Sequence, residues 1–144
     1  KLYLGVGTYG RKLSLTVSPN KFGPYTQLNS VQNEYALDTA EENGVEPFRN
    51  AAGELSYSYV PTATTQKLLS AASLSKGVSG KDEFAARALA YANKTGKTVT
   101  VNLVWWSDAA AIAEKVALAK SSGLAGVSIF KIDGQEDDGL WDSL

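Results

Sequence analysis

The last third of the chain restricts the fold most, because it contains two apolar runs with a helical pattern between them. Residues 98–105 form a β-branched, apolar run, and residues 124–132 form a second one. Ser107 is placed to cap a helix that ends before Gly123. Small apolar residues form the predicted inner face of this helix: Ala109, Ile112, Ala113, Val116 and Ala117. Continuous apolar strands are typical of sheets buried on both faces, so this order predicts an α/β fold.

The first two thirds are predicted to hold shorter elements. Residues 2–8 alternate apolar and small residues, which is typical of a strand, and Gly5 and Gly7 indicate a close approach of backbone or ligand. Residues 12–28 contain Pro19, Gly23 and Pro24, which indicate an irregular loop or weak strands. The remaining patterns predict a helix over 30–42, a hairpin of 45–48 with 55–60, and helices over 65–75 and 82–94, the last with Ser79 and Asp82 as a capping pair.

The residue types that are missing exclude several classes of chemistry. The 144 residues include no His, Cys or Met. Without Cys there is no disulfide, thiol nucleophile or zinc–thiolate site, and without His there is no Ser-His-Asp triad. Acid–base chemistry would have to come from carboxylates, Tyr or Lys. We therefore expect no metal and no cofactor.

Charge and hydropathy bear on the partners. Lys and Arg total 14 against 15 Asp and Glu, a net charge of −1, so no nucleic-acid partner is expected. No apolar run is long enough to span a bilayer. Because Lys1 is not a start methionine and nothing before Leu2 resembles a signal peptide, we expect a piece of a longer protein.

An acidic segment, residues 133–139, follows the second apolar run. Loops after strands carry the sites of many α/β folds, so this segment is a candidate catalytic carboxylate or cation site. It is not an EF-hand loop, because Asp138 stands where that loop needs Gly. The alternative is a solvated turn before a helix, where acidic residues are favoured.

Aromatic and basic residues near strand ends are the other candidates. Adjacent strand residues face opposite ways, so one of Trp105 and Trp106 packs in the core while the other is either displayed for sugar stacking or packed. Tyr9 and Arg11 lie on the same side of a strand end. Arg11 there either binds a polar ligand through its planar guanidinium or forms a structural ion pair. Residues 93–95 match a glycosylation acceptor, which is a common triplet.

Three segments together resemble glycoside hydrolase family 18, the chitinase and N-acetylglucosaminidase family. Residues 4–11 (LGVGTYGR) resemble its "GvPfYGR" strand. Residues 104–109, with Ile112 and Lys115, resemble its "vWYeDa..i..K" segment. Residues 123–137 (GLAGVSIFKIDGQED) resemble "GlgGvmfWaldgDD", the eighth barrel strand and the loop after it.

This resemblance implies the C-terminal portion of a (β/α)₈ TIM barrel with a small α+β insertion. Residues 1–11 would be barrel strand seven, residues 12–104 the insertion, and residues 105–144 the last barrel helix, strand eight and a C-terminal turn. The hairpin with Phe48 and residues 57–59 is most similar to the spore-cortex and germination branch. Such a slice would expose unpaired strand edges, so further barrel polypeptide, from the same chain or another, is an expected partner.

The resemblance also implies a function: part of a glycosidase acting on glycans that contain N-acetylglucosamine, chitin or peptidoglycan, outside the cell or at its surface. Arg11 would hydrogen-bond sugar hydroxyls, Tyr9 would line the groove, and Phe130 would lie beneath the scissile sugar. Trp105 would be a wall residue, and Asp108 would support the residues that touch sugar.

The departures from the family pattern leave enzymatic activity open. The family protonates the leaving oxygen with the Glu of a DxxDxDxE motif, which has no counterpart in this chain, so no catalytic residue is expected here. Phe130 replaces the family's Trp with a smaller ring that has no N–H. The alternatives are a non-catalytic carbohydrate-binding or structural barrel protein, or an independent α+β interaction domain whose motifs match by chance.

Overall fold

A computed structural model describes residues 1–70, 83–132 and 138–144 of the chain. The chain divides into two compact units. The first unit comprises residues 1–11, 30–56 and 105–144, and the second comprises residues 12–29 and 57–104. The division predicted from the family resemblance, at residues 11 and 104, stays a prediction.

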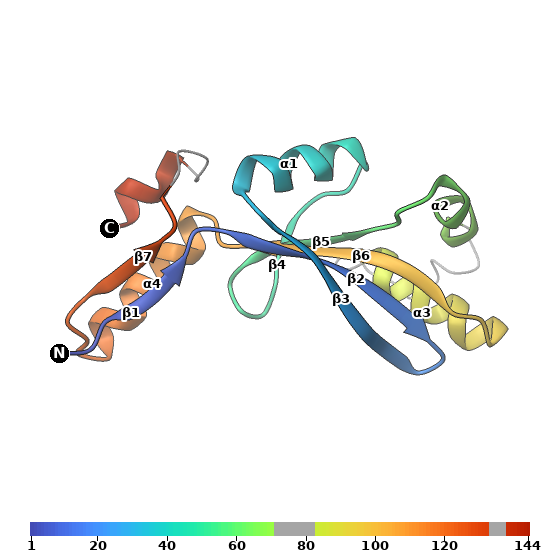
Figure 1. The fold of residues 1–144 in the computed structure, drawn as a ribbon, viewed down its shortest axis with the longest axis horizontal. Helices are drawn as coiled ribbons and strands as arrows, with labels where there is room; N and C mark the ends of the chain where they lie inside the picture. The colour runs from blue at the N-terminus through green and yellow to red at the C-terminus, as the bar shows by residue number, and fades with distance from the viewer. Residues whose placement is uncertain (71–82, 133–137) are drawn as a thin grey trace. The chain divides into compact units, whose positions relative to one another are not determined.

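Strands and helices follow one another along the chain (Figure 1). The elements, in order, are β1 (Leu4–Gly7), β2 (Gly10–Ser18), β3 (Lys21–Val31), α1 (Asn33–Glu42), β4 (Phe48–Arg49), β5 (Leu55–Tyr59), α2 (Ala63–Leu69), α3 (Glu83–Thr95), β6 (Val99–Trp106), α4 (Ala109–Ser121), β7 (Val127–Phe130) and the 3₁₀ helix η2 (Asp138–Ser143).

In the first unit, β1 and β7 form a parallel two-stranded sheet, and α4 lies against it (Figure 1). The register runs from Leu4 opposite Val127 to Gly7 opposite Phe130. Apolar side chains from both strands, α4 and η2 form the core: Val6, Ile112, Val116 and Leu140, with Leu4, Val127 and Ile129 packed against them. The two end strands and the helix before the second one are thus confirmed.

Two details of α4 differ from the expectation. The N-cap is Asp108, whose side chain accepts a hydrogen bond from the Ala111 N–H, so the prediction of Ser107 as cap is wrong. Ser107 is buried, and its hydroxyl is bonded to other side chains. The predicted inner face is also partly wrong, because Ala117 is exposed and the buried residues are Ala111, Ile112, Val116 and Ala119.

The second sheet has the strand order β3-β2-β6-β5-β4. The predicted hairpin is confirmed as an antiparallel β4–β5 pair, with Phe48 opposite Ser56. Of the two alternatives for residues 12–28, an irregular loop or weak strands, the strands are found, because β2 and β3 occupy most of that range. Asn20 forms the turn between them with a φ of 58°, a conformation that Asn tolerates better than most residues.

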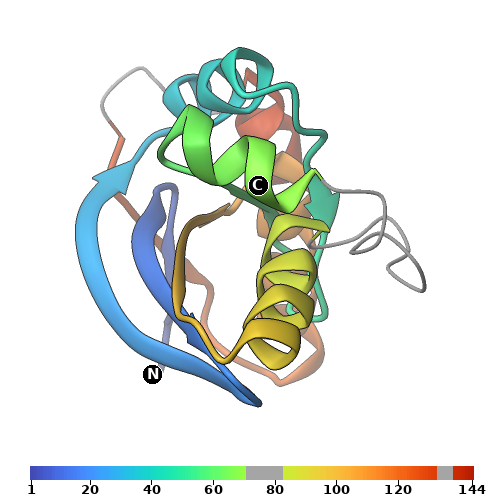
Figure 2. The ribbon, with the colours of Figure 1, turned by 90° about the vertical axis from the view of Figure 1, so that its right-hand side faces the viewer.

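In the second unit, α3 packs beside β2 and β6 (Figure 2). Its small side chains Ala88 and Ala92 meet Val17 and Val101 in a buried cluster, which Leu69 of α2 joins. Both predicted helices of this region are therefore present as α2 and α3, although residues 71–75 of the first prediction lie outside the described residues. The predicted capping pair Ser79 and Asp82 lies outside the described residues. No helix in the described ranges is long and apolar enough to cross a membrane.

Candidate functional site

The aromatic residues Tyr9 and Phe130 meet where β1 and β7 end. Phe130 is the last residue of β7, opposite Gly7, and Tyr9 follows β1 by two residues. Their ring centroids are 6.2 Å apart at an interplanar angle of 83°, an edge-to-face contact. Phe130 is 65% exposed. An aromatic ring is therefore displayed at the carboxyl ends of two parallel strands.

Arg11 completes this cluster. Its guanidinium carbon lies 5.1 Å from the centroid of the Tyr9 ring, a cation–π distance. Its Nη1 donates to the Ser30 hydroxyl at 3.0 Å. Within the described ranges no carboxylate pairs with Arg11, so the structural ion pair considered above is not found there. A guanidinium has five N–H donors, so most of them remain for a ligand.

Thr8 fixes the ends of the two strands to each other. Its backbone N–H donates to the Phe130 carbonyl at 2.9 Å, and its hydroxyl accepts from the Lys131 N–H at 3.1 Å and donates to the Lys131 carbonyl. Thr8 is buried. Thr8 was not among the predicted site residues, although a hydroxyl at the end of an apolar strand is a recognisable signal. Thr8 holds the backbone that carries Phe130.

Gly7 provides the space that Tyr9 needs. A Cβ at Gly7 would lie 3.1 Å from Tyr9 Cε1 and 3.5 Å from the Phe130 carbonyl oxygen. The predicted close approach is therefore confirmed at Gly7. At Gly5 an added Cβ would meet nothing within 4 Å of this chain, so there the predicted approach of a ligand or another backbone stays a prediction.

The two tryptophans have different surroundings. Trp106 is 1% exposed, and its Nε1 donates to Asn33 Oδ1 at 2.8 Å. Trp105 is half-buried and so keeps part of its surface accessible. Gly10 lies close to both, since a Cβ there would be 2.1 Å from the Trp105 carbonyl oxygen and 2.5 Å from Trp106 Cβ. Trp106 is the core residue of the pair.

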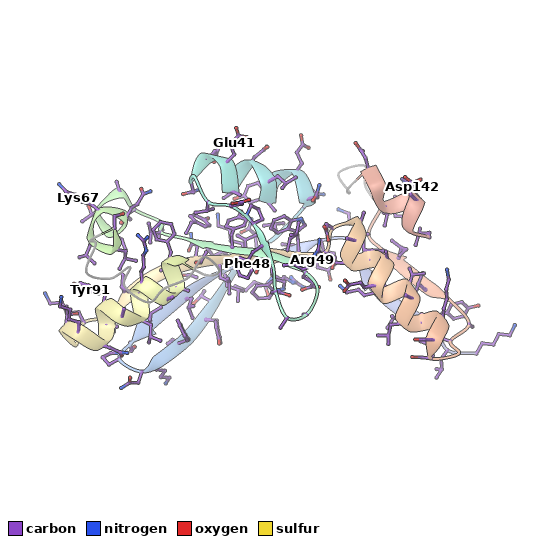
Figure 3. The ribbon with its side chains drawn as sticks, turned by 180° about the vertical axis from the view of Figure 1, so that it is seen from behind. Glu41, Phe48, Arg49, Lys67, Tyr91 and Asp142 are labelled. Atoms are coloured by element: carbon purple, nitrogen blue, oxygen red, sulfur yellow. The ribbon has the colours of Figure 1, made fainter. Side chains whose placement is uncertain are left out.

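Asp108 joins the start of α4 to the β4–β5 hairpin. Its oxygens accept from Arg49 Nη1 at 2.9 Å, from Arg49 Nη2 at 2.7 Å and from the Ala111 N–H at 3.0 Å. Arg49 is labelled in Figure 3. Burial raises the pKa of Asp108, but the hydrogen bonds from Arg49 and Ala111 lower it by a larger amount. The pKa of Asp108 therefore lies below its ordinary value. The same hydrogen bond raises the pKa of Arg49.

A second polar cluster, not predicted from sequence, lies beside this pair. Lys115 Nζ donates to Glu54 Oε1 at 2.8 Å and to the Ser107 hydroxyl at 2.6 Å. Ser107 in turn donates to the same Glu54 oxygen at 3.1 Å. Every pairwise contact is made, so these three groups form a closed structural cluster between the hairpin and α4.

The other sequence candidates add little to the site. Residues 133–137 of the acidic segment lie outside the described residues, and Asp138 begins η2. In the described ranges no group of three acidic, His or Cys side chains is arranged to hold a metal ion. Asn93, of the glycosylation triplet, accepts the Asn20 N–H through Oδ1 at 2.6 Å.

The parallel β1–β7 pair covered by α4, with a second sheet between them in sequence, is the fold of part of a chitinase-like barrel. A solved structure of the spore cortex-lytic enzyme SleL of Bacillus cereus matches it with a TM-score of 0.61 at 19% identity, over 99% of this chain and 24% of that one. The chitinase of Chromobacterium violaceum ATCC 12472 matches with a TM-score of 0.54 at 19% identity, over 99% and 31%. The class V chitinase of Nicotiana tobaccum matches with a TM-score of 0.54 at 18% identity, over 99% and 33%.

These matches confirm the resemblance to the family 18 chitinases at the level of the fold. The chain spans about a quarter to a third of the solved chains that it matches. Neither a protein-family profile nor a curated protein sequence matches it.

Proposed function

We propose that this chain forms one wall of the sugar-binding groove of a family-18-like glycosidase that acts on N-acetylglucosamine-containing glycans, chitin or peptidoglycan. The observation that supports this most is the cluster of Tyr9, Arg11 and Phe130 at the carboxyl ends of β1 and β7. Barrel enzymes place their sites at this end of the strands. The solved structures with this fold include chitinases and a spore cortex-lytic enzyme.

Each residue of the cluster has a chemical task in this proposal. The exposed ring of Phe130 offers an apolar face to the C–H face of a sugar. Arg11 donates to sugar hydroxyl or amide oxygens from the N–H groups that Ser30 does not use. Tyr9 contacts both neighbours and so keeps the guanidinium and the ring in place. Trp105 forms part of the groove wall, and Asp108 supports the residues that touch sugar.

The proton that cleaves the glycosidic bond comes, in this proposal, from a carboxyl group outside these residues. The 144 residues contain no DxxDxDxE motif, and Phe130 offers a smaller ring than the family's Trp. The smaller ring of Phe130 favours the second candidate function, a barrel protein that binds glycan or has a structural role without hydrolysing it.

Further barrel strands are the proposed partner of the β1–β7 sheet. Val127 and Ile129 are only half-buried although they alternate along an apolar strand. Neighbouring parallel strands on both edges would cover them and satisfy the edge N–H and C=O groups. A location outside the cell is proposed from the family resemblance alone.

The first experiment measures glycan binding by Arg11 variants. Titration calorimetry with a chitin hexasaccharide is expected to show binding about tenfold weaker for Arg11→Ala, because charge-assisted hydrogen bonds are lost. Arg11→Lys keeps the charge but not the planar guanidinium. Its affinity for the hexasaccharide is expected to lie between that of the native chain and that of Arg11→Ala. Lys67→Ala, on an exposed position of α2, is the control. Unchanged binding by Arg11→Ala would overturn the proposal.

The second experiment separates the two candidate functions. Intact mass and peptide mapping of the native protein upstream of Lys1 reveal whether a DxxDxDxE segment accompanies these residues. Such a segment together with glycan cleavage supports the glycosidase, and a broken version with binding alone supports the non-catalytic protein.

A further inference from the structure

The second unit contains a pocket that shares no residue with the Tyr9–Arg11–Phe130 cluster. Its volume is about 330 Å³, at the lower end of the range of roughly 300–1,000 Å³ for small-molecule sites. It lies between α2, the start of β6 and Tyr91 of α3. Tyr91 is labelled in Figure 3. Hydroxyl groups dominate its polar lining: Thr62, Thr64, Thr65, Thr98, Thr100 and Tyr91.

The hydroxyls of Thr62 and Thr65 remain partly available. Thr62 Oγ1 accepts the Thr65 N–H at 3.2 Å as the cap of α2, and the two hydroxyl oxygens share one hydrogen bond of 2.9 Å. Only one of the two O–H hydrogens is used in that bond, so the pair keeps one donor and free lone pairs. Thr98 lies directly before β6, and Thr100 is the second residue of that strand; both positions are exposed.

The rest of the lining is apolar. Pro61, Leu68 and Val99 supply aliphatic surface, and Tyr91 is half-buried against the core of the second unit. Within the described ranges no charged side chain lines the pocket. A pocket of this kind offers hydroxyls that both donate and accept, an aliphatic floor and one aromatic ring, but no counter-ion.

We propose that this pocket binds a neutral sugar ring, as a second carbohydrate site. A sugar hydroxyl donates and accepts like a Thr hydroxyl, so the groups match in both directions. The C–H face of the ring packs on Tyr91 and the aliphatic residues. The absence of lining charge in the described ranges disfavours anionic ligands such as phosphates or uronic acids.

The test is residue-resolved amide NMR of the intact chain titrated with N-acetylglucosamine. Saturable shifts are expected at residues 62–65, 91 and 98–100. Thr100→Val removes one hydroxyl at nearly constant volume and is expected to weaken this binding about fivefold. Thr26→Val, at an exposed position of β3, is the matched control and is expected to have no effect. Tyr91→Phe keeps the packing ring and tests the phenolic hydroxyl alone.

Two controls separate this site from the proposed groove. Arg11→Ala is expected to leave the shifts at residues 98–100 unchanged, so failure of the groove does not imply failure of the pocket. Raising the ionic strength to about 1 M is expected to leave the pocket affinity unchanged, because no charge pairs with the ligand. Shifts that do not saturate, shifts confined to residues near Tyr9, or equal effects of Thr100→Val and Thr26→Val would overturn the proposal.

Discussion

Arg49 and Asp108 form a two-pronged ion pair, with Nη1 to Oδ1 at 2.9 Å and Nη2 to Oδ2 at 2.7 Å. The side chain of Asp108 is 13% exposed and that of Arg49 is 37% exposed. Since Asp108 also caps α4, one carboxylate secures both the hairpin and the first turn of the helix. This pair therefore has more structural weight than an isolated surface ion pair.

Asp108→Ala removes the helix cap and the ion pair together. The free energy of unfolding is expected to fall by about 1–2 kcal/mol, after allowance for the solvent exposure of Arg49. Urea denaturation followed by circular dichroism measures the change. Asp38→Ala, an exposed carboxylate on α1, is the control and is expected to shift the midpoint little.

Asp108→Asn keeps an oxygen that can cap α4 but removes the charge. The variant therefore isolates the part of the pH dependence of stability that comes from the ionisation of Asp108. The folded chain holds the pKa of Asp108 below its ordinary value of 3.8, so the unfolded chain binds the proton first as the pH falls. The stabilisation is complete above that ordinary value and is lost as the pH drops through the lowered one. The difference in unfolding free energy between the native chain and Asp108→Asn should therefore be constant well above pH 3.8 and shrink as the pH falls below that value. A constant difference would contradict this assignment.

Glu54 and Lys115 should be energetically coupled. Their atoms lie 2.8 Å apart at partly exposed positions, which suggests a coupling energy of about 0.5–1 kcal/mol in a double-mutant cycle of Glu54→Gln and Lys115→Met. The control cycle replaces Lys115→Met with Lys120→Met, an exposed position on the same helix. An equal coupling energy in both cycles would mean that the contact between Glu54 and Lys115 does not stabilise the fold.

Gly10→Ala and Gly5→Ala form a matched pair of glycine substitutions. The added Cβ at Gly10 would collide with the Trp105 carbonyl oxygen and with Trp106, and backbone atoms cannot move aside cheaply. Its expected cost is about 2–3 kcal/mol. Gly5→Ala meets nothing within 4 Å and is expected to be close to neutral. Thermal denaturation measures the stability of both variants relative to the native chain. An equal loss of stability in the two variants would refute the steric explanation.

The elements that could be predicted from the sequence are those with strong local patterns. The end strands, α4 and the β4–β5 hairpin follow from apolar runs and alternation within a few residues. The strands β2 and β3 were predicted only as an alternative to a loop, because Pro19, Gly23 and Pro24 indicate a loop whether or not a neighbouring strand supplies hydrogen bonds. Pairing with another strand is tertiary information that a local pattern does not contain.

The site was predictable to a similar degree. Tyr9 and Arg11 stood out from their spacing on a strand end, whereas Phe130 was selected only through the family resemblance. The cap at Asp108 was missed because Ser107 is an equally good cap locally, and the partner that favours Asp108 is Arg49, far away in sequence. Glu54 was missed for the same reason, since its partner Lys115 is 61 residues away.

Thr8 and Lys131, whose hydrogen bonds join the ends of β1 and β7, are 123 residues apart in the chain. The contact between Tyr9 and Phe130 therefore forms within one polypeptide. The chain between the two residues links them covalently and so keeps their effective concentration relative to each other high. A single proteolytic cut anywhere between them would leave every residue of the cluster intact but divide it between two fragments. Dilution would then weaken the cluster, although no side chain in it had changed.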